Sequence, residues 1–508
     1  MPTWTPEQLA FISEIKSSTQ SLCLEAVAGS GKTTTLVEAV RNINPNLSVI
    51  ALAFNKQTAE VLSTKMPRNT TSCTLNSLGH SIWAKSGKRK LDSRKISRIV
   101  NSWLSQNLPG ESGQAHWRPL CSLINSCRSA GIVPENWHHK VIGPEPRALT
   151  LSLLDQIAEA NDFILEPWYI RIVEELLGES IAEAITSTID FDDQLYMSTY
   201  FSLDMHWPKF DIVVIDEAQD LSSLQHDMLA RLGHESRLIV VGDTNQAIYG
   251  WRGASCHSMD ELCSRFGLKR MPLTVSFRCP ATVIEEAKAV VPHIRGAKPG
   301  GTVRTQYLTE DTTDQTAFHL SDFVLNSAVL CRTNAPLIRL GLQLVANKTP
   351  CFFAGRDIGP KLGAILKSLP QKAPITEELS NWYLTRRAEL IDKNYLFALD
   401  RHEDEYAALS SVLSIAEVTT VSSAIEALNR LLMKSPTANA VELSTIHKSK
   451  GKEWPTVYFL NPQDIPSFFV KKSGNADALQ QEENLRYVAI TRSLDTLIYL
   501  KTKTPKGE

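Results

Sequence analysis

A glycine-rich segment near the start of the chain constrains the fold more than any other feature. Between a short apolar run and a helix-forming stretch, the chain reads Glu25-Ala26-Val27-Ala28-Gly29-Ser30-Gly31-Lys32-Thr33-Thr34. Glycines let successive backbone N–H groups point at one phosphate, and the positive end of the following helix adds to that attraction. The segment therefore predicts a strand, a phosphate-binding loop and a helix ending near Asn42, in an α/β fold.

Two side chains of this loop are predicted to act on a nucleoside triphosphate. Lys32 is expected to reach the β- and γ-phosphates, and the Thr33 hydroxyl is expected to bind Mg²⁺. Ala26 occupies the position where the general loop pattern has its first glycine. The alternative is a glycine-rich turn that merely precedes an ordinary helix.

An apolar strand that ends in two carboxylates predicts the second half of the same site. The segment reads Val213-Val214-Ile215-Asp216-Glu217-Ala218-Gln219-Asp220. Open α/β sheets place their ligands at the carboxyl ends of their strands. Asp216 is expected to hold Mg²⁺ through its water shell, and Glu217 to orient and deprotonate the attacking water. The alternative is the solvated acidic start of a helix.

Short apolar runs separated by helical segments predict parallel sheets in two parts of the chain. They lie at 22–24, 49–54, 212–215 and 238–241, and again at 302–306, 328–331, 441–445, 457–460 and 496–500. Mostly helical stretches interrupt both parts. We therefore predict two α/β lobes with helical insertions. The first lobe comprises 1–84 and 205–270 around insertion 85–204, and the second comprises 271–356 and 438–508 around insertion 357–437.

Composition limits the classes of protein to which the chain can belong. A length of 508 residues favours two to four domains, and 43% apolar with 21% charged residues is ordinary for a globular protein. The net charge of −2 gives no overall attraction to nucleic acid, so a nucleic-acid groove would need a local basic lining. No apolar run approaches the roughly 20 residues that span a bilayer. Nine cysteines without a C-x-x-C pair, and a start without a signal-peptide pattern, predict a cytoplasmic protein.

Further segments follow one another in a characteristic order. The most specific is Val240-Val241-Gly242-Asp243-Thr244-Asn245-Gln246-Ala247-Ile248-Tyr249-Gly250-Trp251-Arg252-Gly253-Ala254, which is similar to motif III of UvrD-like helicases of superfamily 1A. The others resemble the Q motif (Thr5-Pro6-Glu7-Gln8), motif Ia (Ala53-Phe54-Asn55-Lys56), motif IV (Ser276-Phe277-Arg278), motif V (Leu443-Ser444-Thr445-Ile446-His447-Lys448-Ser449-Lys450-Gly451-Lys452-Glu453) and motif VI (Glu482-Glu483-Asn484-Leu485-Arg486-Tyr487-Val488-Ala489-Ile490-Thr491-Arg492). The resemblance runs from residue 5 to 492 and implies two RecA-like lobes, with ATP and Mg²⁺ as cofactors. The stretch Phe191-Asp192-Asp193 also resembles F-box-type and phage members of the family.

The resemblance implies a role for each residue of an ATP site between the two lobes. Gln8 would read the adenine edge, and Phe277 would stack on adenine. Arg278 and Arg492 would contact the γ-phosphate as arginine fingers in cis, because a guanidinium offers bidentate charge to the transferring group. The implied catalytic residues are Lys32, Thr33, Asp216, Glu217, the γ-phosphate sensor Gln246, Arg278 and Arg492. The other implied ATP contacts are Gln8, Ala26, Val27, Ala28, Gly29, Ser30, Gly31, Thr34, Phe277 and Glu453.

The implied DNA track uses aromatic faces, because stacking does not depend on the identity of the base. The implied DNA contacts are Phe54, Asn55, Thr74, Tyr249, Trp251, Arg252, Thr445 and His447. Core packing is the alternative for a lone tryptophan such as Trp251. A basic run, Lys85, Lys88, Arg89, Lys90, Arg94 and Lys95, would either contact duplex phosphates or form a solvated face.

These features predict an ATP-dependent 3′-to-5′ translocase and helicase in the cytoplasm, associated with the nucleoid. Its expected partners are single-stranded DNA, junctions of single- and double-stranded DNA, and accessory replication or repair proteins. Two alternatives remain open: a translocase that strips proteins from DNA without unwinding it, and a nucleotide-gated regulator without turnover. The segment Thr74-Leu75-Asn76-Ser77-Leu78-Gly79-His80 resembles motif Ib but has Asn76 where the family usually has histidine. The insertion in the second lobe is much shorter than the regulatory domain that the family usually has there. The short segment after Arg492 leaves little chain for the family's strand-separating hairpin.

Overall fold

The computed structural model describes residues 4–250, 257–309, 317–355, 358–370, 372–415, 418–432 and 439–502. The chain forms two compact units, one of Met1–Ala26 with Gly31–Leu273 and the other of Val27–Ser30 with Thr274–Glu508. Each unit is built on a six-stranded sheet whose paired strands are parallel. The predicted fold class, two parallel-sheet lobes with mainly helical insertions, is confirmed.

The sheet of the first unit has the strand order β3-β2-β6-β7-β1-β8. Its strands are β1 (Leu22–Ala26), β2 (Val49–Ala53), β3 (Thr70–Thr74), β6 (Ile212–Ile215), β7 (Arg237–Gly242) and β8 (Lys269–Leu273). Because β1 lies beside β7, and β7 beside β6, the carboxyl ends of these three strands form one edge. The prediction ended this lobe at residue 270, whereas the unit runs to Leu273 because β8 completes the sheet.

Helices cover both faces of this sheet, as the apolar runs require. Alternate residues of one strand belong to different cores: Leu22 and Leu24 of β1 lie in one, and Cys23 lies in the other. The first core involves α1 (Pro6–Ser17), α2 (Lys32–Arg41) and α3 (Lys56–Lys65), and the second involves α4 (Leu75–Ala84), α10 (Ser223–Leu232) and α11 (Ser258–Phe266).

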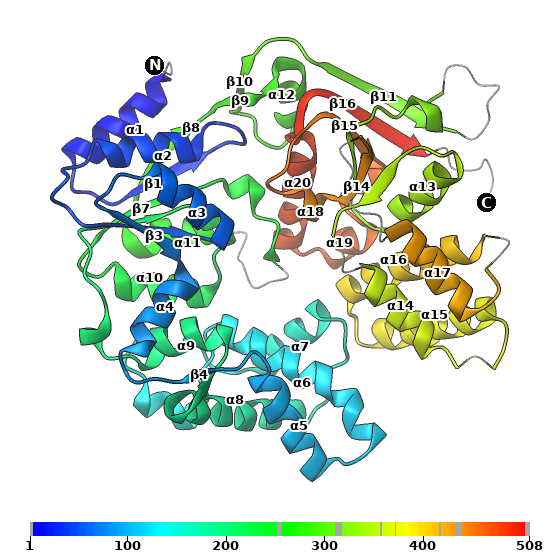
Figure 1. The fold of residues 1–508 in the computed structure, drawn as a ribbon, viewed down its shortest axis with the longest axis horizontal. Coiled ribbons are helices and arrows are strands. Elements are labelled where there is room, and N and C mark those ends of the chain that lie inside the picture. Colours follow the sequence, from blue (N-terminus) through cyan, green and yellow to red (C-terminus); the bar gives the residue numbers. More distant parts are fainter. Residues whose placement is uncertain are drawn as a thin grey trace. The chain divides into compact units, whose positions relative to one another are not determined.

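The insertion of the first unit is mainly a group of helices (Figure 1), and it contains a buried ionic network. Its elements are β4 (Lys90–Leu91), α5 (Lys95–Asn107), α6 (Glu111–Ser129), α7 (Leu151–Ala160), α8 (Tyr169–Thr186), β5 (Thr188–Ile189) and α9 (Phe191–Phe201). Arg128 bonds Asp190 at 2.9 Å and Asp193 at 3.0 Å. Lys95 is fully buried and bonds Asp193 at 2.6 Å. The inclusion of Lys95 in a basic surface run was therefore wrong.

The sheet of the second unit has the strand order β11-β16-β15-β12-β14-β13. Its strands are β11 (Thr302–Leu308), β12 (Ala328–Cys331), β13 (Cys351–Phe353), β14 (Val441–Thr445), β15 (Trp454–Leu460) and β16 (Ser493–Thr502). The helices α12 (Ala281–Ala287), α13 (Ala335–Ala346), α18 (Ile446–Ser449), α19 (Phe468–Ser473) and α20 (Ala476–Ile490) belong to the same unit, where β9 (Val275–Pro280) pairs with β10 (Arg295–Lys298).

The insertion of the second unit shares one core with its sheet. It consists of α14 (Ile358–Ser368), α15 (Ile375–Asp392), α16 (Leu396–Leu413) and α17 (Val421–Leu432), which lie together in Figure 1. Leu366, Leu409 and Leu428 from three of these helices are buried in the cluster that contains strand residue Leu443. The Asp404 carboxylate of α16 also accepts hydrogen bonds from the first backbone N–H groups of α13. Among the described residues, no helix is both long and apolar enough to cross a bilayer.

Candidate functional site

The glycine-rich loop takes the backbone conformation that its sequence requires. Gly29 and Gly31 have φ angles of 73° and 78°, in the left-handed region that favours glycine. Gly31 is the N-cap of α2, and its carbonyl accepts hydrogen bonds from the backbone N–H and the hydroxyl of Thr35, at 2.9 and 3.0 Å. The first turn of α2 therefore begins at Lys32 and includes Thr33 and the exposed Thr34.

The structure brings the lysine and threonine of the loop together with the two carboxylates at the end of β6. Lys32 Nζ lies 2.9 Å from Glu217 Oε2, and Thr33 Oγ1 donates to Asp216 Oδ2 at 3.1 Å. Burial opposes the charge of Lys32, but the carboxylates of Glu217 and its neighbours outweigh that cost and raise the lysine pKa. Burial and the adjacent Glu217 charge raise the pKa of Asp216 to about 6.

A chain of hydrogen bonds continues from this pair to the end of β7. Gln219 Nε2 donates to Glu217 Oε2 at 2.6 Å, and the Asp243 backbone N–H donates to Gln219 Oε1 at 3.0 Å. The Asp243 carboxylate then accepts from Gln246 Nε2 at 2.6 Å. One connected path thus joins Lys32 to Gln246 through side chains at the carboxyl ends of neighbouring strands.

Two residues of this path, Gln219 and Asp243, are absent from the sequence-based site list. Both are almost fully buried, at 0% and 1% exposure. Buried polar groups need hydrogen-bond partners. Asp243 directly follows the apolar strand β7, and Gln219 lies four residues after the end of β6, so both positions were available as a signal in the sequence. Glu217 itself has φ 57° and ψ 41°. A non-glycine residue in this region is strained, and such residues cluster at functional sites.

The donor set around Thr33 and Asp216 fits a magnesium ion. Mg²⁺ is usually held by one or two carboxylates, waters and substrate phosphates rather than by a full protein cage. A hydroxyl and a carboxylate oxygen 3.1 Å apart, beside a phosphate-binding loop, match that pattern. Within the described ranges, no group of three or more histidine, cysteine or acidic residues forms a metal cluster, so this pair is the candidate.

Gln8 lies beside the loop, held by the start of α1. Its side chain and that of Thr5 form reciprocal hydrogen bonds with each other's backbone N–H groups, at 2.9 and 3.2 Å. Its Nε2 also donates to Thr35 Oγ1 at 3.0 Å. A methyl group added to Gly31 would lie 3.4 Å from that Nε2 atom. The contacts thus fix the Gln8 carboxamide next to the start of α2.

The tip of the loop, Val27–Ser30, belongs to the second unit. The Phe277 backbone N–H donates to the Gly29 carbonyl at 2.9 Å, and the Ala28 N–H donates to Tyr487 Oη at 2.8 Å. A methyl group on Gly29 would lie 2.4 Å from Cβ of Arg278. Close approach to β9 therefore requires glycine here. Tyr487 was not predicted as a site residue, although it lies within the segment that resembles motif VI.

The second unit also holds the two predicted arginines near each other. Arg278 Nη2 lies 2.6 Å from Glu453 Oε1, and Nη1 donates to the Thr491 carbonyl at 3.3 Å. Arg492 is 1% exposed and donates to the carbonyls of Val488 and Lys452 at 3.1 and 3.4 Å. Burial and the neighbouring Arg278 charge lower the pKa of Arg492 to about 10. Phe277, by contrast, is 45% exposed.

The predicted DNA contacts of the first unit lie at two neighbouring strand ends. Ala53, the last residue of β2, pairs with Thr74, the last residue of β3. Phe54 and Asn55 directly follow Ala53 and therefore lie near Thr74. The Asn55 and Thr74 side chains accept from the backbone N–H groups of Thr58 and Ser77, at 2.8 and 3.2 Å, and thus cap α3 and α4. The side-chain oxygens of Asn55 and Thr74 therefore already accept hydrogen bonds within the protein. Asn55 is exposed, and its carboxamide NH₂ is the group that would contact DNA.

The remaining predicted DNA contacts are scattered. Tyr249 is half-buried after β7, whereas Trp251 and Arg252 lie outside the described residues. In the second unit, Thr445 ends β14 and is buried, and His447 is half-buried in α18.

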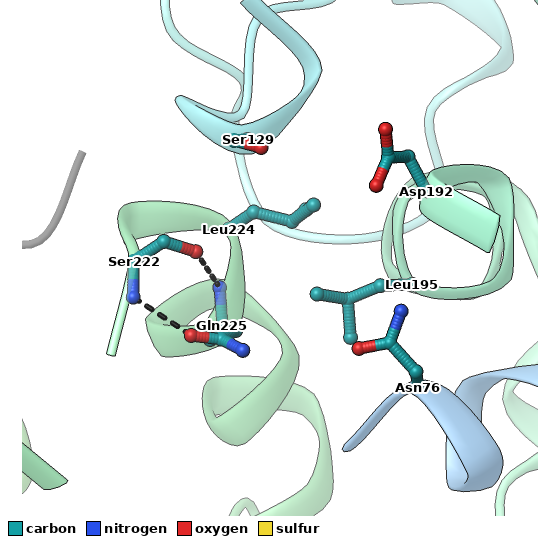
Figure 2. Close-up of a pocket in the computed structure, with 7 residues that line it drawn as sticks. All are labelled: Asn76, Ser129, Asp192, Leu195, Ser222, Leu224 and Gln225. Atoms are coloured by element: carbon teal, nitrogen blue, oxygen red, sulfur yellow. Dashed lines mark hydrogen bonds between the residues drawn. The ribbon is translucent and has the colours of Figure 1, made fainter. Parts of the chain in front are cut away.

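Asn76, the departure in motif Ib, borders a small polar hollow of about 120 Å³ (Figure 2). Its Nδ2 donates to the Phe191 carbonyl at 3.1 Å, which fastens α4 to α9. Figure 2 shows Asp192 at the same hollow, and the Asp192 carboxylate lies 3.2 Å from Arg128. A carboxylate in the lining disfavours the binding of a phosphate in this hollow.

Comparison with known proteins agrees with this arrangement. Residues 4–267 match the profile of the UvrD/REP helicase N-terminal domain, and residues 388–504 match that of the UvrD-like helicase C-terminal domain. The chain is 24% identical over 533 residues to the F-box DNA helicase protein 1 of Schizosaccharomyces pombe, with 98% of the chain and 58% of that protein aligned. It is 24% identical to the ATP-dependent DNA helicase PcrA of Leuconostoc citreum, with 67% of the chain and 49% of that protein aligned. It is 21% identical to the PcrA of Staphylococcus epidermidis, with 97% of the chain and 82% of that protein aligned. The chain therefore spans about half the length of the first two relatives.

Proposed function

Because the chain belongs to the UvrD/REP helicase family, we propose that it is an ATP-dependent DNA helicase that moves 3′ to 5′ along single-stranded DNA. The observation that carries this proposal is the hydrogen-bonded path from Lys32 through Glu217, Gln219 and Asp243 to Gln246. It connects a phosphate-binding lysine and a candidate general base to the segment that contains Tyr249. A motor needs such a connection, because each ATP hydrolysis event must change the conformation of the residues that contact DNA.

In the proposed reaction, Lys32 binds the β- and γ-phosphates of ATP, and Glu217 accepts a proton from the attacking water. Thr33 and Asp216 would hold Mg²⁺, which when bound neutralises developing charge on the phosphates. Glu217 is suited to its role because Lys32 and Gln219 hold its carboxylate in one orientation. Gln8, beside the start of α2, would contact the base.

Arg278 and Arg492 are proposed to act on the γ-phosphate from within the same chain. Cβ of Arg278 lies close to Gly29, so the arginine side chain begins beside the loop backbone that would bind phosphate. Arg492 keeps its proton at neutral pH, because a pKa of about 10 is still well above 7. Only one carboxylate, Glu453, pairs directly with Arg278 in the described residues. Phosphate oxygens would thus be strong competitors for both guanidinium groups.

Single-stranded DNA is expected to stimulate ATP hydrolysis, and Trp251→Ala is expected to reduce that stimulation more than the basal rate. Loss of one stacking face costs roughly 1–3 kcal/mol per base, which corresponds to an increase of about fivefold to about 150-fold in the DNA concentration needed for half-maximal stimulation. Phosphate release measured over a range of oligonucleotide concentrations tests this. Trp117→Ala is the matched control, because Trp117 is an exposed tryptophan of α6 at 37% exposure.

An unchanged response of Trp251→Ala to DNA would assign Trp251 to core packing. Hydrolysis that no DNA stimulates would favour the nucleotide-gated regulator, and stimulated hydrolysis without strand separation would favour a translocase that strips proteins. Junctions of single- and double-stranded DNA, accessory replication or repair proteins, and a location at the nucleoid in the cytoplasm belong to the same proposal.

A further inference from the structure

A second hollow, of about 490 Å³, opens in the first unit where α4, α8 and α9 end. Its lining includes three basic side chains, Lys85, Arg89 and Lys140, which we call the rim cations, and three apolar side chains, Ile185, Phe201 and Leu203, which we call the floor. We call it the Lys85–Lys140 hollow. None of the residues of the implied ATP site or DNA track lines it, although Lys85 and Arg89 belong to the basic run that was predicted either to contact duplex phosphates or to form a solvated face.

The rim cations are fixed in place without being neutralised. Arg89 donates to the Ile185 carbonyl through Nε and Nη2, at 3.1 and 2.7 Å, and to the Gly87 carbonyl at 2.7 Å. Lys85 Nζ donates to the His206 carbonyl at 2.6 Å. In the described part of the chain, no carboxylate lines the hollow, and none of the three forms an ion pair. Carbonyl groups orient a cation but leave its charge, so the rim attracts anions.

The floor indicates that the ligand also has an apolar part. Leu203 is 47% exposed, and the adjacent Met205 is 80% exposed. Large aliphatic side chains that remain exposed beside a hollow are typical of interaction sites. A ligand that offered charge alone would leave this surface in water.

The aromatic residues at or beside the hollow offer little stacking surface, and Phe201 of its lining is only 8% exposed. The Arg89 guanidinium lies 4.8 Å from the ring centre of Trp83, and Lys140 Nζ lies 4.3 Å from that of Trp137. Each cation therefore covers an indole face that a nucleobase would need. The floor favours an aliphatic side chain over a base.

We propose that the Lys85–Lys140 hollow binds an acidic segment of a partner protein, with an aliphatic or phenyl side chain on the floor and carboxylates on the three rim cations. Charge complementarity selects the partner, and burial of Leu203 and its neighbours supplies affinity. Of the basic run in the sequence, Lys85 and Arg89 would then serve a protein partner rather than duplex phosphates. The site does not depend on ATP or on DNA binding.

The test uses the full chain and a fluorescein-labelled dodecapeptide with a central Leu-Phe-Leu flanked by aspartates, followed by fluorescence anisotropy. Saturable binding is expected, with an affinity that falls as salt rises. The double variant Lys85→Glu/Lys140→Glu and the floor variant Leu203→Asp are each expected to weaken binding at least about tenfold. Lys88→Glu is the matched control, because Lys88 is an exposed member of the same run that does not line the hollow. It should stay within about twofold of the original chain.

Basal ATP hydrolysis shows that each variant is folded, since none of these residues belongs to the ATP site. Three results would overturn the proposal. One is no saturable binding of the peptide by the original chain, and another is equal binding by a peptide with asparagine in place of every aspartate. The third is displacement of the peptide by a single-stranded or duplex oligonucleotide together with weaker DNA binding by the double variant. That last result would assign the hollow to nucleic acid.

Discussion

Lys32→Ala is expected to reduce ATP hydrolysis to background, a loss of at least about a hundredfold. Lys32 is the cation at the start of α2, and neighbouring carboxylates keep it protonated by raising its pKa. Alanine would remove the charge that stabilises the transferring phosphoryl group, and it would remove one of the contacts that orient the Glu217 carboxylate. Binding of single-stranded DNA should largely survive, because the proposed DNA contacts do not include this residue.

Phosphate release in the presence of saturating single-stranded DNA measures the effect, and filter binding of a labelled oligonucleotide measures DNA affinity. Lys209→Ala is the control, because Lys209 is an exposed lysine of the same unit that also pairs with a glutamate, Glu235, at 2.8 Å. If Lys32→Ala hydrolysed ATP at the original rate, the loop could not be the phosphate site.

Glu217→Gln is expected to bind ATP and Mg²⁺ yet turn over at least about a hundredfold more slowly, as for the loss of a general base. The substitution keeps the shape of the side chain and an oxygen that can accept from Lys32 or Gln219. What it removes is the ability to take up a proton from water. The fold and the nucleotide affinity should therefore change little.

Single-turnover hydrolysis separates this chemical step from product release, and a fluorescent ATP analogue reports binding. Glu235→Gln provides the surface control, since Glu235 is 65% exposed in its pair with Lys209. A normal rate for Glu217→Gln would place the general base elsewhere. A loss of ATP affinity equal to the loss of rate would instead make Glu217 a binding residue.

Apolar strands of the two sheets were predictable because they are buried on both faces. The runs at 212–215, 328–331 and 441–445 match β6, β12 and β14 in the structure. β3 was not predicted because its sequence, Thr-Thr-Ser-Cys-Thr, is polar at the edge of the sheet. β8 contains two basic residues and Pro272, which an edge strand tolerates but which hide the strand in the sequence.

The candidate site was predictable where its residues are consecutive in the chain. The loop 26–34 and the pair Asp216 and Glu217 form short segments whose chemistry can be read directly. The hydrogen bond between Gln219 and Asp243 could not be predicted, because Asp243 lies 24 positions away, after the end of β7. Only the sheet order places those two residues together.

The burial of Lys95 and the helix-capping roles of Asn55 and Thr74 were not predicted, although the sequence contains signals for both. Lys95 lies four residues before the buried Ile99 of α5, so helical periodicity would have placed it on the buried side of the helix. Asn55 and Thr74 each precede a helix in the position that favours an N-cap. Helix capping was thus predictable for both residues, in addition to the DNA contacts that the family resemblance implies for them.

Strand separation on two partial duplexes, one with a 3′ single-stranded tail and one with a 5′ tail, tests most directly whether the chain is a directional DNA motor. The original chain and Lys32→Ala are compared under single-turnover conditions, with phosphate release followed in the same reactions. The expected result is ATP-dependent separation from the 3′ tail, none from the 5′ tail, and none by the variant. Separation only from the 5′ tail would contradict the direction, and separation by Lys32→Ala as fast as by the original chain would contradict an ATP-driven motor.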